Sequence, residues 1–181
     1  MTSAVDMLDH LLTHPLRFLS SALPVGLALL LVMLANLPVS FTGGALPAPA
    51  LALAAVYFWV LVRPDLMPPF AVLIVGLMED LLSGGPPGLW AAGFLTAYAL
   101  TDRQRETFAG LAGAGALLGF AGAMLLAGGT AYVLATVIYV RFPPLPPLLL
   151  ESVSTVVFYP LVALSMGWVH KKIVGPMRGG E

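Results

Sequence analysis

Residues Phe108–Val140 read FAGLAGAGALLGFAGAMLLAGGTAYVLATVIYV, which is 33 residues without a charged side chain. A helix needs about 20 mostly apolar residues to cross the roughly 30 Å hydrocarbon core of a bilayer. The stretch therefore predicts a membrane-spanning helix, although a straight helix of this length would reach about 50 Å. Gly128-Gly129 near its middle is a predicted kink or break. The pattern leaves two alternatives, one tilted and bent helix or two pieces.

Apolar segments continue on both sides of this stretch. Hydrophobic residues make up 59% of the 181-residue chain and charged residues 9%, whereas a soluble domain carries about a quarter charged residues. We therefore predict an all-α, polytopic membrane bundle of about six helices, in which the five other apolar segments are Arg17–Val39, Pro47–Val62, Pro68–Leu82, Gly88–Leu100 and Pro147–Val169. The third and fourth helices in chain order are short for a bilayer, so we expect them to end inside it with their connecting loop sheltered by protein.

The basic residues predict the orientation of the bundle. With six spans and the N-terminus in the cytoplasm, Arg141 lies outside, and the seven basic residues inside are Arg17, Arg63, Arg103, Arg105, Lys171, Lys172 and Arg178. This asymmetry follows the positive-inside rule, and two full crossings within 108–140 would break it by moving Lys171 and Lys172 outside. The sequence thus predicts a short interfacial segment 1–16, a six-helix domain 17–170 and a cytoplasmic basic tail 171–181.

Several functional classes lack the residues that they need. The chain has no cysteine, which excludes disulfides, thiolate metal sites and thiol catalysis. His10, His14 and His170 lie in polar terminal regions, and no phosphate-binding loop, dinucleotide motif or zinc spacing occurs. The first apolar run is too long for a cleaved signal core, and Asp6 and Asp9 precede it where basic residues are expected. We expect no enzyme activity, no cofactor and no metal.

The most distinctive pattern is GLMEDLLSGGPPG, which occupies Gly76–Gly88. A glycine or an aspartate recurs there at every fourth position, as Gly76, Asp80, Gly84 and Gly88. On a helix Gly76 and Asp80 share a face, and a glycine beside a carboxylate lets another helix approach it closely. An ionisable residue within a span is costly and usually functional, so we expect Asp80 to be buried. Glu79 then reaches the outer surface or pairs with Arg141; alternatively, both acids lie in water at the helix end.

Three further groups of residues are candidates for contacts. Arg141 and Glu151 flank the last outer loop, where a pair with each other, or with Glu79 and Asp80, is within reach. Small residues at every fourth position indicate close helix packing, either within the bundle or against another molecule; they are Gly115, Gly119, Ala123, Ala127, Ala131 and Ala135. The cytoplasmic basic residues either set the topology alone or face a partner on that side; they are Arg103, Arg105, Lys171 and Lys172.

The segment Pro68–Leu100 resembles one known family. Its Pro68-Pro69-Phe70, the glycine and aspartate pattern of Gly76–Gly84, and Gly88-Leu89 before a further apolar helix are similar to the rod shape-determining protein MreD family. The resemblance implies a non-enzymatic subunit of the cell-elongation machinery in the bacterial inner membrane. It also implies a single-pass partner, MreC, and a working relation to RodA, its transpeptidase and MreB filaments. The family fold is similar to the substrate-binding subunit of energy-coupling-factor transporters.

Two functions therefore remain open. In the first, the bundle is a scaffold that binds the membrane helix of an MreC-like protein, and Asp80 fixes a buried polar contact. In the second, it is a vitamin-type, small-molecule binding subunit of a transporter, which needs a polar cavity near the outer face. The polar residues available for such a cavity are Asn36, Thr42, Glu79, Asp80, Ser83, Thr96, Tyr98 and Glu151. The fold alone does not separate these functions.

Overall fold

The computed structural model describes residues 22–37, 47–109 and 114–174, and every regular element in these ranges is a helix. In chain order the elements are a helix at Ala22–Ala35, α2 (Leu51–Val62), the short 3₁₀ turn η1 (Pro64–Leu66), α3 (Pro69–Ser83), α4 (Leu89–Arg103), α5 (Arg105–Ala109), α6 (Ala114–Tyr139), α7 (Leu145–Val169) and the π-helical turn η2 (His170–Val174). The all-α prediction is confirmed, and each of the six predicted segments contains a helix. The predicted interfacial segment 1–16 and the tail beyond residue 174 lie outside the described residues.

Two of these helices are long and apolar enough to cross a membrane. They are Ala114–Tyr139 and Leu145–Ile173, the second of which combines α7 with most of η2. The helices α2, α3 and α4 have 12, 15 and 15 residues, fewer than the roughly 20 that a full crossing requires. The predicted shortness of the third and fourth segments is therefore confirmed. Their loop is less sheltered than predicted, because Ser83, Gly84 and Pro87 are exposed in the described part of the chain.

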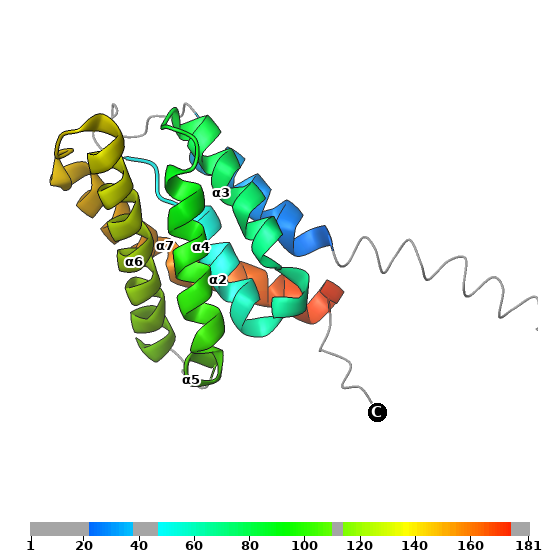
Figure 1. Cartoon of the computed structure of the whole chain (residues 1–181). Helices are drawn as coiled ribbons and strands as arrows, with labels where there is room; N and C mark the ends of the chain where they lie inside the picture. Colours follow the sequence, from blue (N-terminus) through cyan, green and yellow to red (C-terminus); the bar gives the residue numbers. More distant parts are fainter. Residues whose placement is uncertain (1–21, 38–46, 110–113, 175–181) are drawn as a thin grey trace, which may run out of the picture.

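Of the two alternatives for Gly128-Gly129, the structure has one continuous helix rather than two pieces. Helix α6 runs without interruption through Gly128-Gly129, and Figure 1 shows it as one continuous ribbon. Gly128 is buried where α6 meets α7, since a β-carbon there would lie 3.6 Å from the side chains of Leu148 and Ser152. This glycine therefore serves the contact between two helices, and a helix inside a packed bundle tolerates glycine when neighbours compensate for its low propensity.

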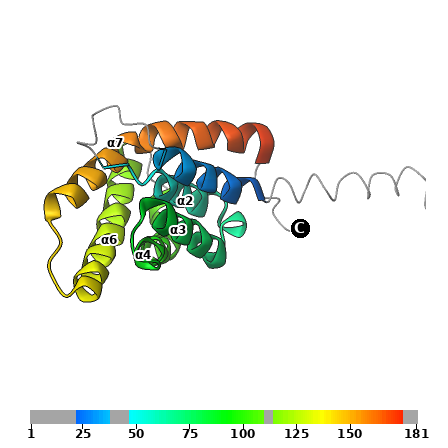
Figure 2. The same ribbon diagram turned by 90° about the horizontal axis from the view of Figure 1, so that it is seen from above.

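Helix α4 lies at the centre of the bundle, between α3 and α6, while α7 passes across α2 and α6 (Figures 1 and 2). The predicted small-residue stripe faces this centre: Gly119, Ala123, Ala127, Ala131 and Ala135 are buried, and Gly115 is half-buried. At the contact, a β-carbon on Gly93 of α4 would lie 2.8 Å from the carbonyl oxygen of Ala127. Of the two alternatives for the stripe, the structure therefore confirms internal packing.

Large aromatic side chains fill the space between α2, α6 and α7. The rings of Phe120 and Tyr159 stack with their centroids 4.4 Å apart, and Tyr57 meets Phe120 edge to face at 5.3 Å. Trp59 and Phe94 are fully buried as well. Aromatic pairs of this kind add about 0.5–1.5 kcal/mol each beyond the area that they bury. Aromatic rings therefore fill the core between α2, α6 and α7, and small residues allow close packing between α4 and α6.

Apolar side chains also cover the outside of the two long helices. On α6 the exposed fractions are 73% for Leu118, 66% for Leu125 and 69% for Val137. The exposed face of α7 carries Val153, Val157, Leu161 and Leu164. Soluble monomers rarely expose contiguous apolar surface of this extent. The two helices that are long enough to cross a bilayer are therefore also the ones whose surface suits lipid.

Candidate functional site

The Asp80 carboxylate lies at the junction between α3 and α4 and is completely buried. Its Oδ2 atom accepts hydrogen bonds from the backbone N–H groups of Gly88 at 2.8 Å and Ala91 at 3.2 Å, and its Oδ1 atom accepts one from Trp90 at 2.6 Å. The first N–H groups of a helix have no partner within the helix and carry partial positive charge. Asp80 therefore caps α4 from the neighbouring helix and satisfies amides that Gly88, which has no side chain, leaves open.

Each glycine of the four-residue pattern has its own physical role in this junction. A β-carbon on Gly76 would lie 2.5 Å from the Cα of Ala91, so glycine is what lets α3 and α4 approach closely enough for Asp80 to reach the amides. Gly84 ends α3 with φ +72°, and Gly88 precedes α4 with φ +101°. Residues with a β-carbon rarely adopt these left-handed conformations. The pattern thus encodes a tight helical hairpin rather than one uniform face.

Glu79 is also buried, with 4% of its surface exposed. Its Oε1 atom accepts a hydrogen bond of 2.9 Å from Nδ2 of Asn36, which ties α3 to the helix Ala22–Ala35. The Oε2 atom has no hydrogen-bond partner among the described residues. The predictions that Glu79 reaches the outer surface or pairs with Arg141, and that both acids lie in water, are therefore wrong. The burial predicted for Asp80 is confirmed.

The predicted pair of Arg141 and Glu151 does not form. Arg141 is exposed in the bend after α6, and its guanidinium lies 6.0 Å from the ring centre of Tyr139. Glu151 is half-buried in the second turn of α7, and Glu79 is near enough to act on it electrostatically. The arginine precedes the proline-rich turn while the glutamate lies inside the next helix, so the turn separates them. Within the described ranges the ion pair that forms is Arg63 with Asp65, at 2.8 Å.

The predicted basic residues lie at the ends of helices. Arg103 is exposed at the C-terminus of α4, and Arg105 is half-buried at the start of α5. Lys171 and Lys172 are exposed in η2, where the ammonium of Lys172 lies 4.7 Å from the ring centre of Trp168. Cations near a helix C-terminus interact favourably with the helix dipole. All four therefore lie at or next to helix ends in the described part of the chain.

Two contacts that organise the bundle were not predicted from the sequence. The hydroxyl of Thr155 in α7 accepts a hydrogen bond of 2.9 Å from the backbone N–H of Ala50, just before α2. The sequence analysis named Asn36 only as a polar residue available for a cavity, whereas in the structure its side chain donates a hydrogen bond to Glu79. Both contacts join residues 43 or more positions apart, and no local spacing signals such a pair.

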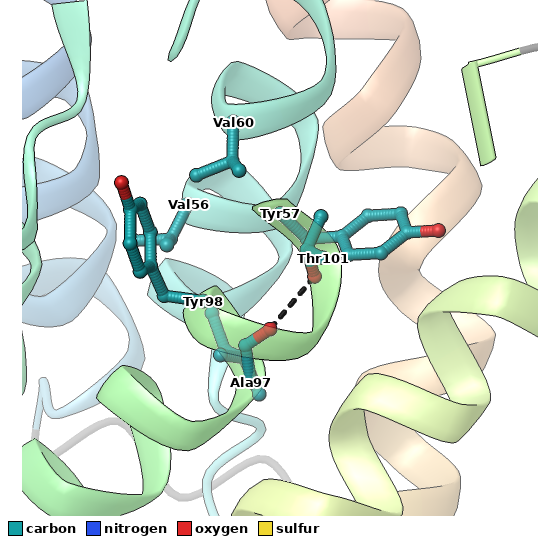
Figure 3. Close-up of a pocket in the computed structure, with 7 residues that line it drawn as sticks. Val56, Tyr57, Val60, Ala97, Tyr98 and Thr101 are labelled. Atoms are coloured by element: carbon teal, nitrogen blue, oxygen red, sulfur yellow. Dashed lines mark hydrogen bonds between the residues drawn. The ribbon is translucent and has the colours of Figure 1, made fainter. Parts of the chain in front are cut away.

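Side chains fill the space between α2 and α4, whereas a groove opens at the edge of the bundle. Between α2 and α4, the space around Val56, Tyr57 and Tyr98 has no room for a water molecule, and Figure 3 shows the two tyrosine rings directed to opposite sides. The groove encloses about 290 Å³ and is lined by Leu89, Trp90, Ala131, Tyr132, Ala135, Pro143, Pro144, Pro147, Leu148 and Glu151. In the described part of the chain, no three acidic or histidine residues are grouped so as to hold a metal ion.

No protein-family model, curated protein or solved structure matches the chain. The features that bear on function are the hairpin of α3 and α4, the exposed faces of α6 and α7, and the groove.

Proposed function

We propose that this protein is a non-enzymatic scaffold of the bacterial cell-elongation machinery, of the MreD type. It lies in the inner membrane with six passes and with both termini in the cytoplasm. It binds the membrane helix of a single-pass, MreC-like protein and so supports peptidoglycan synthesis by RodA and its transpeptidase along MreB filaments. The resemblance of Pro68–Leu100 to that family motivates the proposal, and the geometry supports it in the following ways.

The observation that carries the proposal is the uncovered face of α6. Gly122 and Gly129 lie on this face, both are exposed, and a β-carbon on either would meet nothing within 4 Å. The large apolar side chains of Leu118, Leu125 and Val137 flank them. Glycines bordered by apolar side chains let another membrane helix approach closely, which is how helices associate where lipid removes the hydrophobic driving force. We call this surface, formed by Leu118, Gly122, Leu125, Gly129 and Val137, the α6 face.

The hairpin of α3 and α4 gives the scaffold its rigidity. Because Asp80 uses both oxygens on the chain's own amides, its role in partner binding is to fix the position of α4, against which α6 packs. Short helices such as α3 and α4 are compatible with six passes if they meet the bilayer surface within a shielded or wet region. Asp80 therefore contributes to partner binding indirectly, by holding α4 in place. The buried polar contact predicted for it is a contact within the chain.

The lack of space between α2 and α4 favours a scaffold over a vitamin-type binding subunit with a cavity there. Such a subunit needs a polar cavity, and the space between α2 and α4 admits no water. Of the candidate polar residues, Asp80 and the Oε1 atom of Glu79 are already engaged within the chain. Thr96 donates to the carbonyl of Gly93 and meets Thr130 at 3.1 Å. These side chains therefore hold helices together in the described structure.

A pull-down from native membranes tests the proposal. The tagged protein, solubilised in mild detergent, should recover a single-pass protein in near-equal amount. The variant Gly122→Phe fills the α6 face and should lose that partner, whereas Leu164→Phe, on the exposed face of α7, should retain it. Recovery of an ATPase pair with its coupling subunit, or equal recovery of the partner by both variants, would overturn the proposal.

A further inference from the structure

The groove at the edge of the bundle is lined mostly by apolar side chains. Residues from the start of α4, the end of α6 and the start of α7 line it, and its volume is about 290 Å³. Trp90 and Tyr132 contribute aromatic rings, Pro143, Pro144 and Pro147 contribute stiff apolar walls, and Glu151 contributes the single carboxylate. Ligand sites have this composition, with mostly apolar walls and few polar groups that fix orientation.

Glu151 has no cation near it in the described structure. Its side chain makes no hydrogen bond or ion pair there, and the charge that acts on it comes from another acid, Glu79. Arg141, which the sequence placed beside it, is exposed elsewhere. A carboxylate in apolar surroundings is costly unless a cation or hydrogen-bond donors compensate for it. A positively charged occupant would supply the compensation that the ionised form of Glu151 lacks in the described structure.

The walls restrict the shape of that occupant. Apolar surface suits a methylene stem, and lysine and arginine side chains combine such a stem with a cationic end. A guanidinium also binds a carboxylate through two parallel hydrogen bonds and stacks on aromatic rings. The groove offers both partners, since Glu151 and the rings of Trp90 and Tyr132 line the same space.

We propose that this groove binds a cationic group on a slim apolar stem, supplied by an arginine or lysine side chain of the partner's membrane segment. The choice of a protein side chain rests on the proposed function, because the groove borders the α6 face. Tyr132 lies in the groove, and Gly129 of the α6 face is three residues before it on the same helix. Side chains three apart on a helix are neighbours, so a helix seated on the α6 face passes the groove.

The first test uses n-propylguanidinium, an analogue of the arginine side chain, and the full chain in nanodiscs of zwitterionic phosphatidylcholine. Calorimetric titration should show binding, with n-propylurea, its neutral analogue, at least tenfold weaker. Glu151→Gln should weaken n-propylguanidinium binding by tenfold or more. Leu148→Phe should also weaken it by filling the groove, whereas Leu149→Phe, at an exposed neighbour outside the lining, should leave it unchanged. Equal binding of both probes, or binding unaffected by Glu151→Gln and Leu148→Phe, would overturn the site.

The second test separates this inference from the proposed function. In the native complex, excess n-propylguanidinium should release the partner. Glu151→Gln should lower the recovery of the partner while keeping the wild-type thermal transition. A partner that is recovered in full with Glu151→Gln overturns the inference and leaves the scaffold intact. Probe binding without any recovered partner overturns the scaffold, and with it the choice of a protein side chain as the occupant.

Discussion

The hairpins α3–α4 and α6–α7 contain similar residues near their turns, but their carboxyl groups have different surroundings. Each turn contains a pair of prolines, Pro86-Pro87 in one and Pro143-Pro144 in the other, and each hairpin contains a carboxylate close to the turn. In the first hairpin Asp80 is completely buried and accepts three backbone hydrogen bonds. In the second, Glu151 is half-buried in a groove, without a described partner.

The difference comes from where the carboxylate lies relative to the next helix. Asp80 precedes its turn, and Gly76 allows the backbone of α4 to approach, so the open amides of α4 surround the carboxylate. Glu151 follows its turn and lies within α7, whose amides are already used by the helix. One hairpin thus uses its acid to complete the fold. The other leaves its acid available for a molecule outside the described structure.

Among the substitutions that test this difference between the hairpins, replacing Asp80 by leucine should have the largest effect on stability. The three amides at the start of α4 would then be buried without an acceptor, and each orphaned group costs about 1–3 kcal/mol. We expect Asp80→Leu to lower the free energy of unfolding by about 3–5 kcal/mol, as measured by SDS titration in mixed micelles. Asp80→Asn, which keeps one acceptor oxygen, should lower the free energy of unfolding by less than Asp80→Leu does. Leu81→Ala, at an exposed neighbour, should have little effect; an equal loss there would contradict the capping role.

Gly76→Ala tests whether close approach makes the cap possible. The new methyl group would lie 2.5 Å from the Cα of Ala91, so α3 and α4 would have to separate. Overpacking of this kind costs about 1–3 kcal/mol. Gly122→Ala is the matched control, because nothing lies within 4 Å of its β-carbon, and it should stabilise α6 by up to about 1 kcal/mol. If thermal unfolding shows the same shift for both variants, contact with α4 is not the reason for Gly76.

Glu151→Gln should not lower the free energy of unfolding, in contrast to Asp80→Leu. Without an occupant the Glu151 side chain makes no hydrogen bond or ion pair among the described residues, so replacing it with an amide removes no stabilising contact. We expect stability in zwitterionic micelles to stay the same or rise, by less than about 1 kcal/mol. The same SDS titration measures it. A loss comparable with that of Asp80→Leu would mean that Glu151 is part of the fold and would remove the contrast between the hairpins.

The two hairpins also show what sequence is able to predict. The apolar segments, their shortness at α3 and α4, and the burial of Asp80 follow from local composition and helical spacing, and the structure confirms them. The sequence left open whether the helix continues through Gly128-Gly129, because contact with α7 decides that position. Glu79 was misplaced for the same reason, since its partner Asn36 lies 43 residues away. Local pattern gives the elements, whereas pairing between distant elements depends on packing that a single sequence does not display.

The ion pair of Arg63 and Asp65 is a third case to compare with Asp80 and Glu151, and it has the smallest expected effect on stability. This carboxylate has a partner, as Asp80 does, but 47% of its side chain is exposed. The hydrogen bond from Arg63 lowers the pKa of Asp65 below its usual value of 3.8. The ion pair therefore stabilises the fold above that value and is lost as the pH falls through the lowered pKa. Because exposed pairs contribute about 0–1 kcal/mol, Asp65→Asn should lower the melting temperature slightly at neutral pH and not at strongly acidic pH. A melting temperature lowered equally at both pH values would show that Asp65 acts through something other than its charge, so that the ion pair with Arg63 is not what stabilises the fold.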